Sequence, residues 1–233
     1  MVPDYDEVWN EVYGDLQDRG PAHRHMRRIY RRLLGDLDYS SALDVGCGAG
    51  HNLPLISEGH SMDRIAGADL SKVALAAAAK RHPEAEFFEL DIEQDSAPDQ
   101  WELVFSAFVL EHLPADTDAL RNMRAMTARH LVVSTVAGDF ERYRPWDEQM
   151  GHVRNYAVGE LERKVTEAGF RVQRTIYWGF PFYTPVARTL QNRMTSEPSF
   201  GLGARIASST MYLLYWLNSH RRGDLVVLHA TAG

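Results

Sequence analysis

The chain has 233 residues, of which 45% are hydrophobic and 24% charged, a composition typical of a soluble globular protein that folds around one α/β core. Its formal net charge of −7 argues against broad binding to nucleic acids. The single cysteine, Cys47, excludes an internal disulfide framework and indicates a reducing compartment, so we expect a cytoplasmic protein.

The first 36 residues predict a helical cover. We expect no signal peptide, because the start is acidic and has no apolar core. An aromatic stripe from Tyr5 to Leu16, which includes Tyr13, predicts an amphipathic helix that either packs on the domain or closes over a ligand. Residues 23–34 predict a second amphipathic helix, which is rich in arginine. Its arginines form a solvated face or, alternatively, contact phosphate or an anionic membrane surface.

Residues 42–52 predict a strand, a tight turn and the start of a helix. The turn contains Gly46, Gly48 and Gly50. Glycine is needed where the backbone takes positive φ or lies against a ligand, and the first amides of a helix are unpaired donors. A dinucleotide-binding turn would have glycine where His51 stands. Asp44 would repel a pyrophosphate, whereas it suits a ligand that carries positive charge.

Strands and helices alternate along the rest of the chain. The predicted strands are residues 64–69, 85–90, 101–108, 130–136, 170–178 and 224–230, and the predicted helices are residues 72–81, 116–128 and 158–168. This alternation predicts a mainly parallel sheet with helices on both faces. Asp69 and Asp91 each follow a predicted strand, and Asp69 lies at about the distance from the glycines at which an acid meets a ribose.

Two segments lack this alternation. Residues 137–156 are polar and aromatic without a period, which predicts a functional loop at the carboxyl edge of the sheet. Residues 180–222 form an insertion with an apolar stretch, 206–217, that is too short for the roughly 20 residues of a membrane span. By default the insertion packs on its own domain. The alternatives are a cap on the substrate pocket, a dimer face or a membrane contact.

The run Asp-Val-Gly-Cys-Gly-Ala-Gly, residues 44–50, resembles the first motif of the class I S-adenosyl-methionine-dependent methyltransferases. Asp69, Asp91 and residues 105–114 follow in the family's order, so the resemblance covers about residues 40–170. It implies a doubly wound α/β fold with a mainly parallel seven-stranded sheet whose last strand is antiparallel. We expect a single domain, 1–233, made of a helical cover (1–36), a cofactor-binding core (37–179), a helical insertion or lid (180–222) and the last strand (223–233).

The resemblance also implies a cofactor, S-adenosyl-methionine, with S-adenosylhomocysteine as its product. The implied cofactor-binding residues are Asp44, Gly46, Cys47, Gly48, Asn52, Asp69, Leu70, Asp91, Ile92, Ser106, Ala107, Phe108 and His112. Residues 151–156 resemble a segment of the small-molecule members. The candidate catalytic residues are His152, His112 and Tyr156, and the candidate substrate-binding residues are Tyr13, Tyr143, Trp146, His152, Arg154, Tyr156, Phe182 and Tyr183. For the histidines, a purely structural role that holds the loop remains the alternative.

The reaction implied is in-line displacement, in which the protein aligns the reactants and a base is needed only for a protonated, weakly acidic nucleophile. We expect no metal, because the acids of residues 139–148 lack a ligand spacing. The expected acceptor is an oxygen or nitrogen of a small molecule: a natural-product intermediate, a sugar or a lipid-linked precursor.

Nucleic acid is not expected as a substrate, because residues 106–109 differ from the Asn-Pro-Pro-Tyr type of segment found in amino-methylating nucleic-acid enzymes of this fold. The protein would be a monomer or a homodimer, with peripheral membrane contact left open. The alternatives in function are a non-catalytic cofactor-binding scaffold, a nicotinamide-dependent oxidoreductase and an enzyme that works at a membrane surface.

Overall fold

A computed structural model describes residues 20–191 and 209–233. Its centre is a seven-stranded sheet in the order β3-β2-β1-β4-β5-β7-β6. The strands are β1 Ser41–Val45, β2 Arg64–Asp69, β3 Glu86–Glu89, β4 Trp101–Ala107, β5 Thr127–Val136, β6 Phe170–Trp178 and β7 Leu225–Ala232. β7 is antiparallel to both of its neighbours, and the pairs among β1 to β5 are parallel. The predicted doubly wound, mainly parallel sheet is therefore confirmed.

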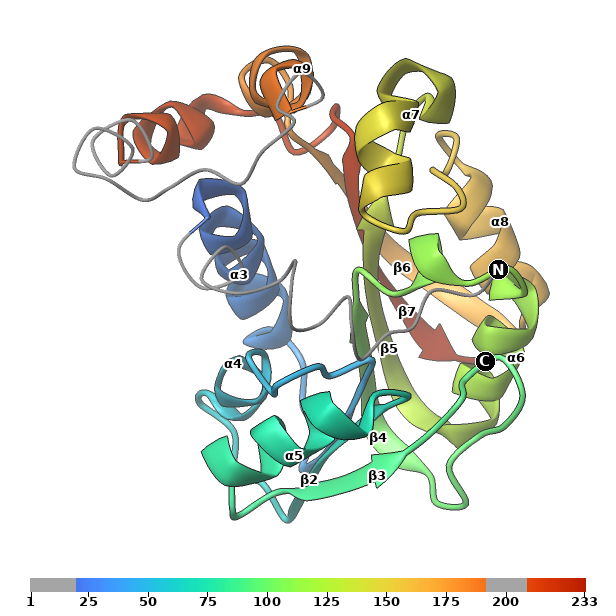
Figure 1. Ribbon diagram of the computed structural model, residues 1–233. Helices are drawn as coiled ribbons and strands as arrows, with labels where there is room; N and C mark the ends of the chain where they lie inside the picture. The colour runs from blue at the N-terminus through green and yellow to red at the C-terminus, as the bar shows by residue number, and fades with distance from the viewer. Residues whose placement is uncertain (1–19, 192–208) are drawn as a thin grey trace.

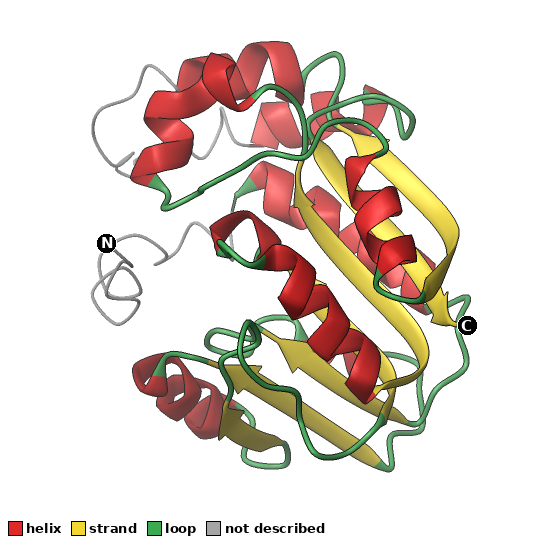
Figure 2. Ribbon diagram, turned by 90° about the vertical axis from the view of Figure 1, so that its right-hand side faces the viewer, coloured by secondary structure: helices red, strands yellow, loops and turns green. Residues whose placement is uncertain are grey.

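Helices cover both faces of the twisted sheet (Figures 1 and 2). The helices are α3 Pro21–Leu34, α4 Leu53–Ser57, α5 Lys72–Arg81, α6 Asp116–Met126, α7 Phe140–Gln149, α8 Glu160–Glu167 and α9 Arg188–Gln191. Because successive strand residues point to opposite faces, Leu43 packs with α6 and α8, whereas the adjacent Ala42 packs with α3 and α4. Two apolar layers therefore hold the carboxyl ends of the strands in one fixed row.

Helices α3 and α5 form for reasons that the sequence shows. α3 buries one apolar stripe, which includes Met26, Ile29 and Tyr30, and its arginines lie on the remaining face. α5 begins at Ser71, whose hydroxyl accepts a hydrogen bond from the N–H of Ala74 at 3.1 Å, as an N-cap does. α6 ends two residues earlier and β5 begins three residues earlier than expected, because Thr127 already pairs with β4 and its hydroxyl donates to the Met123 carbonyl at 2.6 Å.

The prediction of a loop over residues 137–156 was wrong in its first half, where α7 forms. Asp139 caps this helix by accepting from the N–H of Glu141 at 3.0 Å. Ion pairs join Arg144 to acids one turn away on either side. The buried face carries Tyr143 and the charged Asp147 in place of an aliphatic stripe, so no apolar period marks the helix.

The described part of the insertion packs against the domain. Tyr183 stacks on Trp178 with a centroid separation of 5.5 Å, and Tyr215 meets Trp178 edge to face at 5.6 Å. His25 of α3 contacts the carbonyl of Tyr212 at 2.7 Å, which ties the second half of the insertion to the amino-terminal helix. The aromatic stripe around Tyr13 and residues 192–208 lie outside the described residues. Across residues 20–191 and 209–233, no helix combines the length and apolarity needed to cross a bilayer.

Candidate active site

The glycine turn connects β1 to α4 at the carboxyl edge of the sheet. Gly46, Gly48 and Gly50 have φ of 70°, 51° and 75°, a region that other residues rarely adopt. A Cβ on Gly46 would lie 2.2 Å from Cγ2 of Val109, in the segment that follows β4. The turn is therefore packed tightly against the end of β4, with bare backbone at its surface.

Asp44 lies in β1 directly before this turn and is 1% exposed. Among the described residues, neither of its carboxylate oxygens has a hydrogen-bond partner in good geometry, and the side chain of Asn52 lies close enough to favour the charged form. Burial raises the pKa of Asp44 well above its ordinary value, and the nearby Asp69 raises it further. An unpaired buried carboxylate is costly, and a cationic group beside it would remove that cost.

Two more acids stand at the next strand ends. Asp69, at the end of β2, accepts from the N–H of Gly48 at 2.8 Å and from the N–H of Ser71 at 2.9 Å. Asp91, two residues past β3, accepts from the N–H of Glu93 at 3.1 Å. Since β3, β2 and β1 are neighbours in the sheet, the three carboxylates form one row along the carboxyl edge. The side chain of Ile92 is buried beside Asp91.

The end of β4 carries an unusual backbone conformation. Phe108 is the one described residue other than glycine with a positive φ, 59°. This conformation costs a bulky residue about 1–3 kcal/mol and is typical of functional sites. The N–H of Phe108 donates to the Ser134 carbonyl at 2.8 Å. The kink leads directly into a short 3-10 turn, Leu110–His112, and so directs Glu111 and His112 away from the strand.

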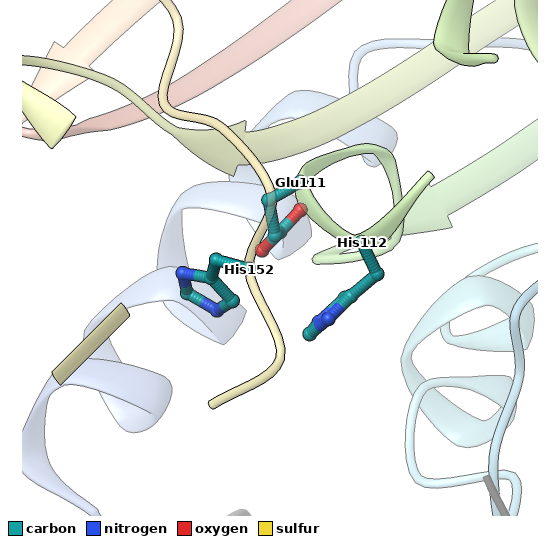
Figure 3. A group of neighbouring side chains, drawn as sticks. All are labelled: Glu111, His112 and His152. Carbon is teal, nitrogen blue, oxygen red and sulfur yellow. The ribbon is translucent and has the colours of Figure 1, made fainter. Parts of the chain in front are cut away.

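His112 and His152 meet although they lie in distant parts of the sequence. Their rings are edge to face with centroids 4.9 Å apart, and Glu111 lies beside them (Figure 3). The N–H of Val153 donates to the carbonyl of Glu111 at 2.8 Å, which fixes the loop after α7 against the turn after β4. Burial lowers the pKa of His112 from its ordinary value, so its imidazole is neutral near pH 7.

Tyr156 and Arg154 both contact Asp116 of α6. The Tyr156 hydroxyl donates to Asp116 at 2.6 Å and is buried in the core, and Arg154 pairs with Asp116 and donates to the Pro114 carbonyl. Lys164 completes this cluster at 2.6 Å from Asp116. These contacts hold the loop to α6 and α8 and give Tyr156 a structural role, while its catalytic role stays a prediction.

The remaining candidates lie in the two segments that follow β5 and β6. Tyr143 and Trp146 belong to α7, and the Tyr143 hydroxyl donates to the Thr184 carbonyl at 3.1 Å. Phe182 and Tyr183 belong to the insertion, which α7 therefore contacts. Of the cofactor candidates not yet placed, Cys47 is buried in the turn, Leu70 is exposed, and Ser106 and Ala107 end β4, where Ser106 is buried.

Sequence reasoning missed two residues of this site. Glu111 is fully buried and supports the loop, and its place beside His112 was the only available signal. Asp147 lies 3.3 Å from Nδ1 of His152 and is held by Arg188 at 2.9 Å. No linear pattern connects Asp147 to Arg188, because one comes from the helix after β5 and the other from the insertion.

The sequence profile of a family described as a methyltransferase domain matches residues 19–175. The chain belongs to this methyltransferase family. The expectation of a class I S-adenosyl-methionine-dependent methyltransferase, with its characteristic fold, is thereby confirmed.

Among proteins of assigned function, the methyltransferase is similar to a trans-aconitate 2-methyltransferase of Rhizobium etli, with 33% identity over 82 residues. That match covers 35% of this chain and 32% of the relative, so the chain aligns with about a third of the length of the curated relatives it matches.

Solved structures share the fold at low identity. A putative methyltransferase of Haloferax volcanii, in complex with the Trm112 methyltransferase activator, has a TM-score of 0.70 at 16% identity, covering 100% of this chain and 97% of that one. Magnesium protoporphyrin IX methyltransferase of Synechocystis, solved with bound S-adenosyl-methionine, has a TM-score of 0.58 at 15% identity, covering 100% and 93%.

Proposed function

We propose that this methyltransferase transfers the methyl group of S-adenosyl-methionine to an oxygen or nitrogen atom of a small molecule. One observation carries the proposal most directly. In the part of the chain that the structure describes, Asp44 is buried without a hydrogen-bond partner in good geometry, next to a bare glycine turn. The methionyl part of S-adenosyl-methionine carries an ammonium group, which would supply the missing cation.

The neighbouring residues fit the other parts of the cofactor. Asp69 at the end of β2 would receive the ribose hydroxyls, and Asp91 would accept from the adenine amino group with Ile92 against the ring. The kinked residues 106–108 would then lie beside the sulfonium.

When bound, S-adenosyl-methionine supplies a methyl group that its positive sulfur already makes electrophilic. The chain aligns the acceptor for in-line attack and excludes water. His112 is neutral near pH 7 and lies beside His152, so the pair is suited to orient an acceptor hydroxyl and take its proton. The acceptor oxygen forms the new bond to carbon, and the electron pair of the broken carbon–sulfur bond stays on sulfur.

The acceptor is proposed to be a natural-product intermediate, a sugar, a lipid-linked precursor or a small carboxylic acid. We include small carboxylic acids because the curated relative is named as a trans-aconitate 2-methyltransferase. The aromatic side chains of α7 and the insertion favour an acceptor with a planar or apolar part. We further propose that the protein is a cytoplasmic monomer or homodimer. If it contacts a membrane surface, the exposed side chains of Leu213, Trp216 and Leu217 would make that contact.

The position of Asp44 also weighs against a nicotinamide cofactor, because a buried acid beside the turn would repel a pyrophosphate. An experiment distinguishes an active methyltransferase from a scaffold that binds S-adenosyl-methionine without turnover. The protein is incubated with S-adenosyl-methionine carrying a labelled methyl group and a panel of small acceptors that includes trans-aconitate. We expect one acceptor to gain the label with formation of S-adenosylhomocysteine. Tight cofactor binding without label transfer to any class of acceptor would favour the scaffold.

A further inference from the structure

Three side chains from two separate segments gather at one point beside the proposed methyl-transfer site. Glu111 and His112 come from the turn after β4, and His152 comes from the loop after α7 (Figure 3). Each offers one potential ligand atom, and these atoms all lie within 4.8 Å of one another. Such a mixed set of one carboxylate and two imidazoles is a common binding set for transition metals in proteins.

Glu111 has an open coordination position. Its side chain is 0% exposed, and its Oε2 accepts from the hydroxyl of Thr135 at 2.8 Å. Its Oε1 is buried and has no hydrogen-bond partner within residues 20–191 and 209–233. Because a buried carboxylate oxygen without a partner is costly, this atom marks a place where a positive ligand would be stabilised.

Each histidine has an acceptor near its Nδ1. Nδ1 of His112 contacts the Gly151 carbonyl at 3.1 Å, and Nδ1 of His152 lies 3.3 Å from Oδ1 of Asp147. An acceptor at Nδ1 places the proton there and leaves the lone pair on Nε2. Asp147 is itself held by Arg188 at 2.9 Å and by Asn155 at 2.7 Å, so the supporting contacts are in place before any ion binds.

We propose that Glu111, His112 and His152 bind one divalent transition-metal ion, such as Zn²⁺, Mn²⁺ or Fe²⁺. With metal–ligand bonds of about 2.0–2.2 Å, tetrahedral ligand atoms lie roughly 3.5 Å apart, so the three side chains draw together by about 1 Å on binding. Three protein ligands leave at least one open coordination position. Two imidazole nitrogens argue against Mg²⁺ or Ca²⁺, which prefer oxygen ligands.

The open position suits an oxygen atom of the methyl acceptor, and this part of the inference rests on the proposed function. A bound divalent ion lowers the pKa of a coordinated hydroxyl. The acceptor proton then passes to water, and the two histidines act as ligands rather than as a base. The expectation from the sequence, that no metal is used, considered only the acids of residues 139–148. Of these acids, Asp147 enters the site, as a support for His152.

The test measures metal binding directly. The full chain is purified without a polyhistidine tag, stripped with a chelator and titrated by calorimetry with Zn²⁺ and with Mn²⁺. We expect one ion per chain for the preferred metal, and affinity reduced more than about 100-fold by Glu111→Gln and by His152→Ala. His220→Ala, at an exposed histidine, is the matched control and should leave the affinity unchanged. Co²⁺ should give a visible absorption spectrum that is lost in Glu111→Gln.

Binding of S-adenosylhomocysteine to each variant confirms that the variant is folded. It also separates the two proposals, since an ion bound at Glu111 without nucleoside binding would overturn the proposed function alone. Nucleoside binding with no ion bound to the wild type, or with equal metal affinity in wild type and Glu111→Gln, would overturn the metal site. A variant that fails to bind S-adenosylhomocysteine is replaced by Thr135→Val, for which we expect a loss in metal affinity of about 10-fold. No loss in that variant would likewise count against the site.

Discussion

The carboxylate of Asp69 accepts a hydrogen bond from the backbone N–H of Gly48 at 2.8 Å, so the end of β2 fixes the turn that follows β1. We expect Asp69→Ala to lower the affinity for S-adenosylhomocysteine by at least about 100-fold, because it removes the proposed ribose ligand and releases the turn. The lost backbone contacts should also cost about 1–3 kcal/mol in the free energy of unfolding. Calorimetry and urea unfolding measure the two effects, and an unchanged affinity would refute the ribose role.

Two glycines with similar backbone conformations allow a matched comparison. Gly46 and Gly59 have φ of 70° and 81°, but a Cβ would meet Val109 at Gly46 and nothing within 4 Å at Gly59. Gly59→Ala should cost about 1 kcal/mol of stability and leave cofactor affinity intact. Gly46→Ala should cost more and abolish binding, and Val109→Ala in the same chain should restore part of the loss. Equal effects at both glycines would show that the packing at Gly46 is unimportant.

His152 should matter for turnover and not for the cofactor. It lies beside His112, on the loop that follows α7, and it is not among the residues implied to bind the cofactor. We expect His152→Ala to reduce kcat by about 10²–10⁴-fold, whether it acts as base or as metal ligand, while the Kd for S-adenosylhomocysteine changes less than about three-fold. The measurement is kcat beside calorimetric affinity, and wild-type turnover would remove the proposed role.

A second histidine pair, far from the site, makes stability depend on pH. Nδ1 of His130 and Nε2 of His229 lie 3.2 Å apart on β5 and β7. Burial, with repulsion from His130, lowers the pKa of His229 to about 4. The unfolded chain gains this proton near pH 6.5, so the stabilisation is complete above that pH and is lost as the pH falls toward 4.

His229→Gln should therefore reduce the loss of stability between pH 7 and pH 4.5. The expected difference is on the order of 1 kcal/mol, allowing for the partial exposure of the ring. Urea unfolding at several pH values checks it. Burial also lowers the pKa of His23 to about 4, so the variant should retain part of the decline. Identical declines in wild type and variant would contradict the assignment to His229.

The sequence predicted the sheet and the glycine turn after β1 well because their signals are local. Gly46 takes a positive φ that favours glycine, and Asp69 and Asp91 stand at the ends of successive strands, so short stretches of sequence show both features. The site around His152 was less predictable, since it depends on Asp147 and Glu111, which only the folded chain brings near. α7 was missed because its buried face contains Tyr143 and a paired Asp147, whose stabilisation comes from Arg188 in a distant segment.

The most direct test of the central claim is calorimetric titration of the wild type and Asp44→Asn with S-adenosylhomocysteine and S-adenosyl-methionine. Because Asp44 is buried and has no partner in good geometry among the residues described, the variant should be at least as stable as the wild type. We predict that the wild type binds one nucleoside per chain and that the variant, although folded, binds at least about 10-fold more weakly, since a charged hydrogen bond is worth about 1.5–3 kcal/mol. A folded wild-type protein that binds neither nucleoside, or equal affinity in the variant, would contradict the account.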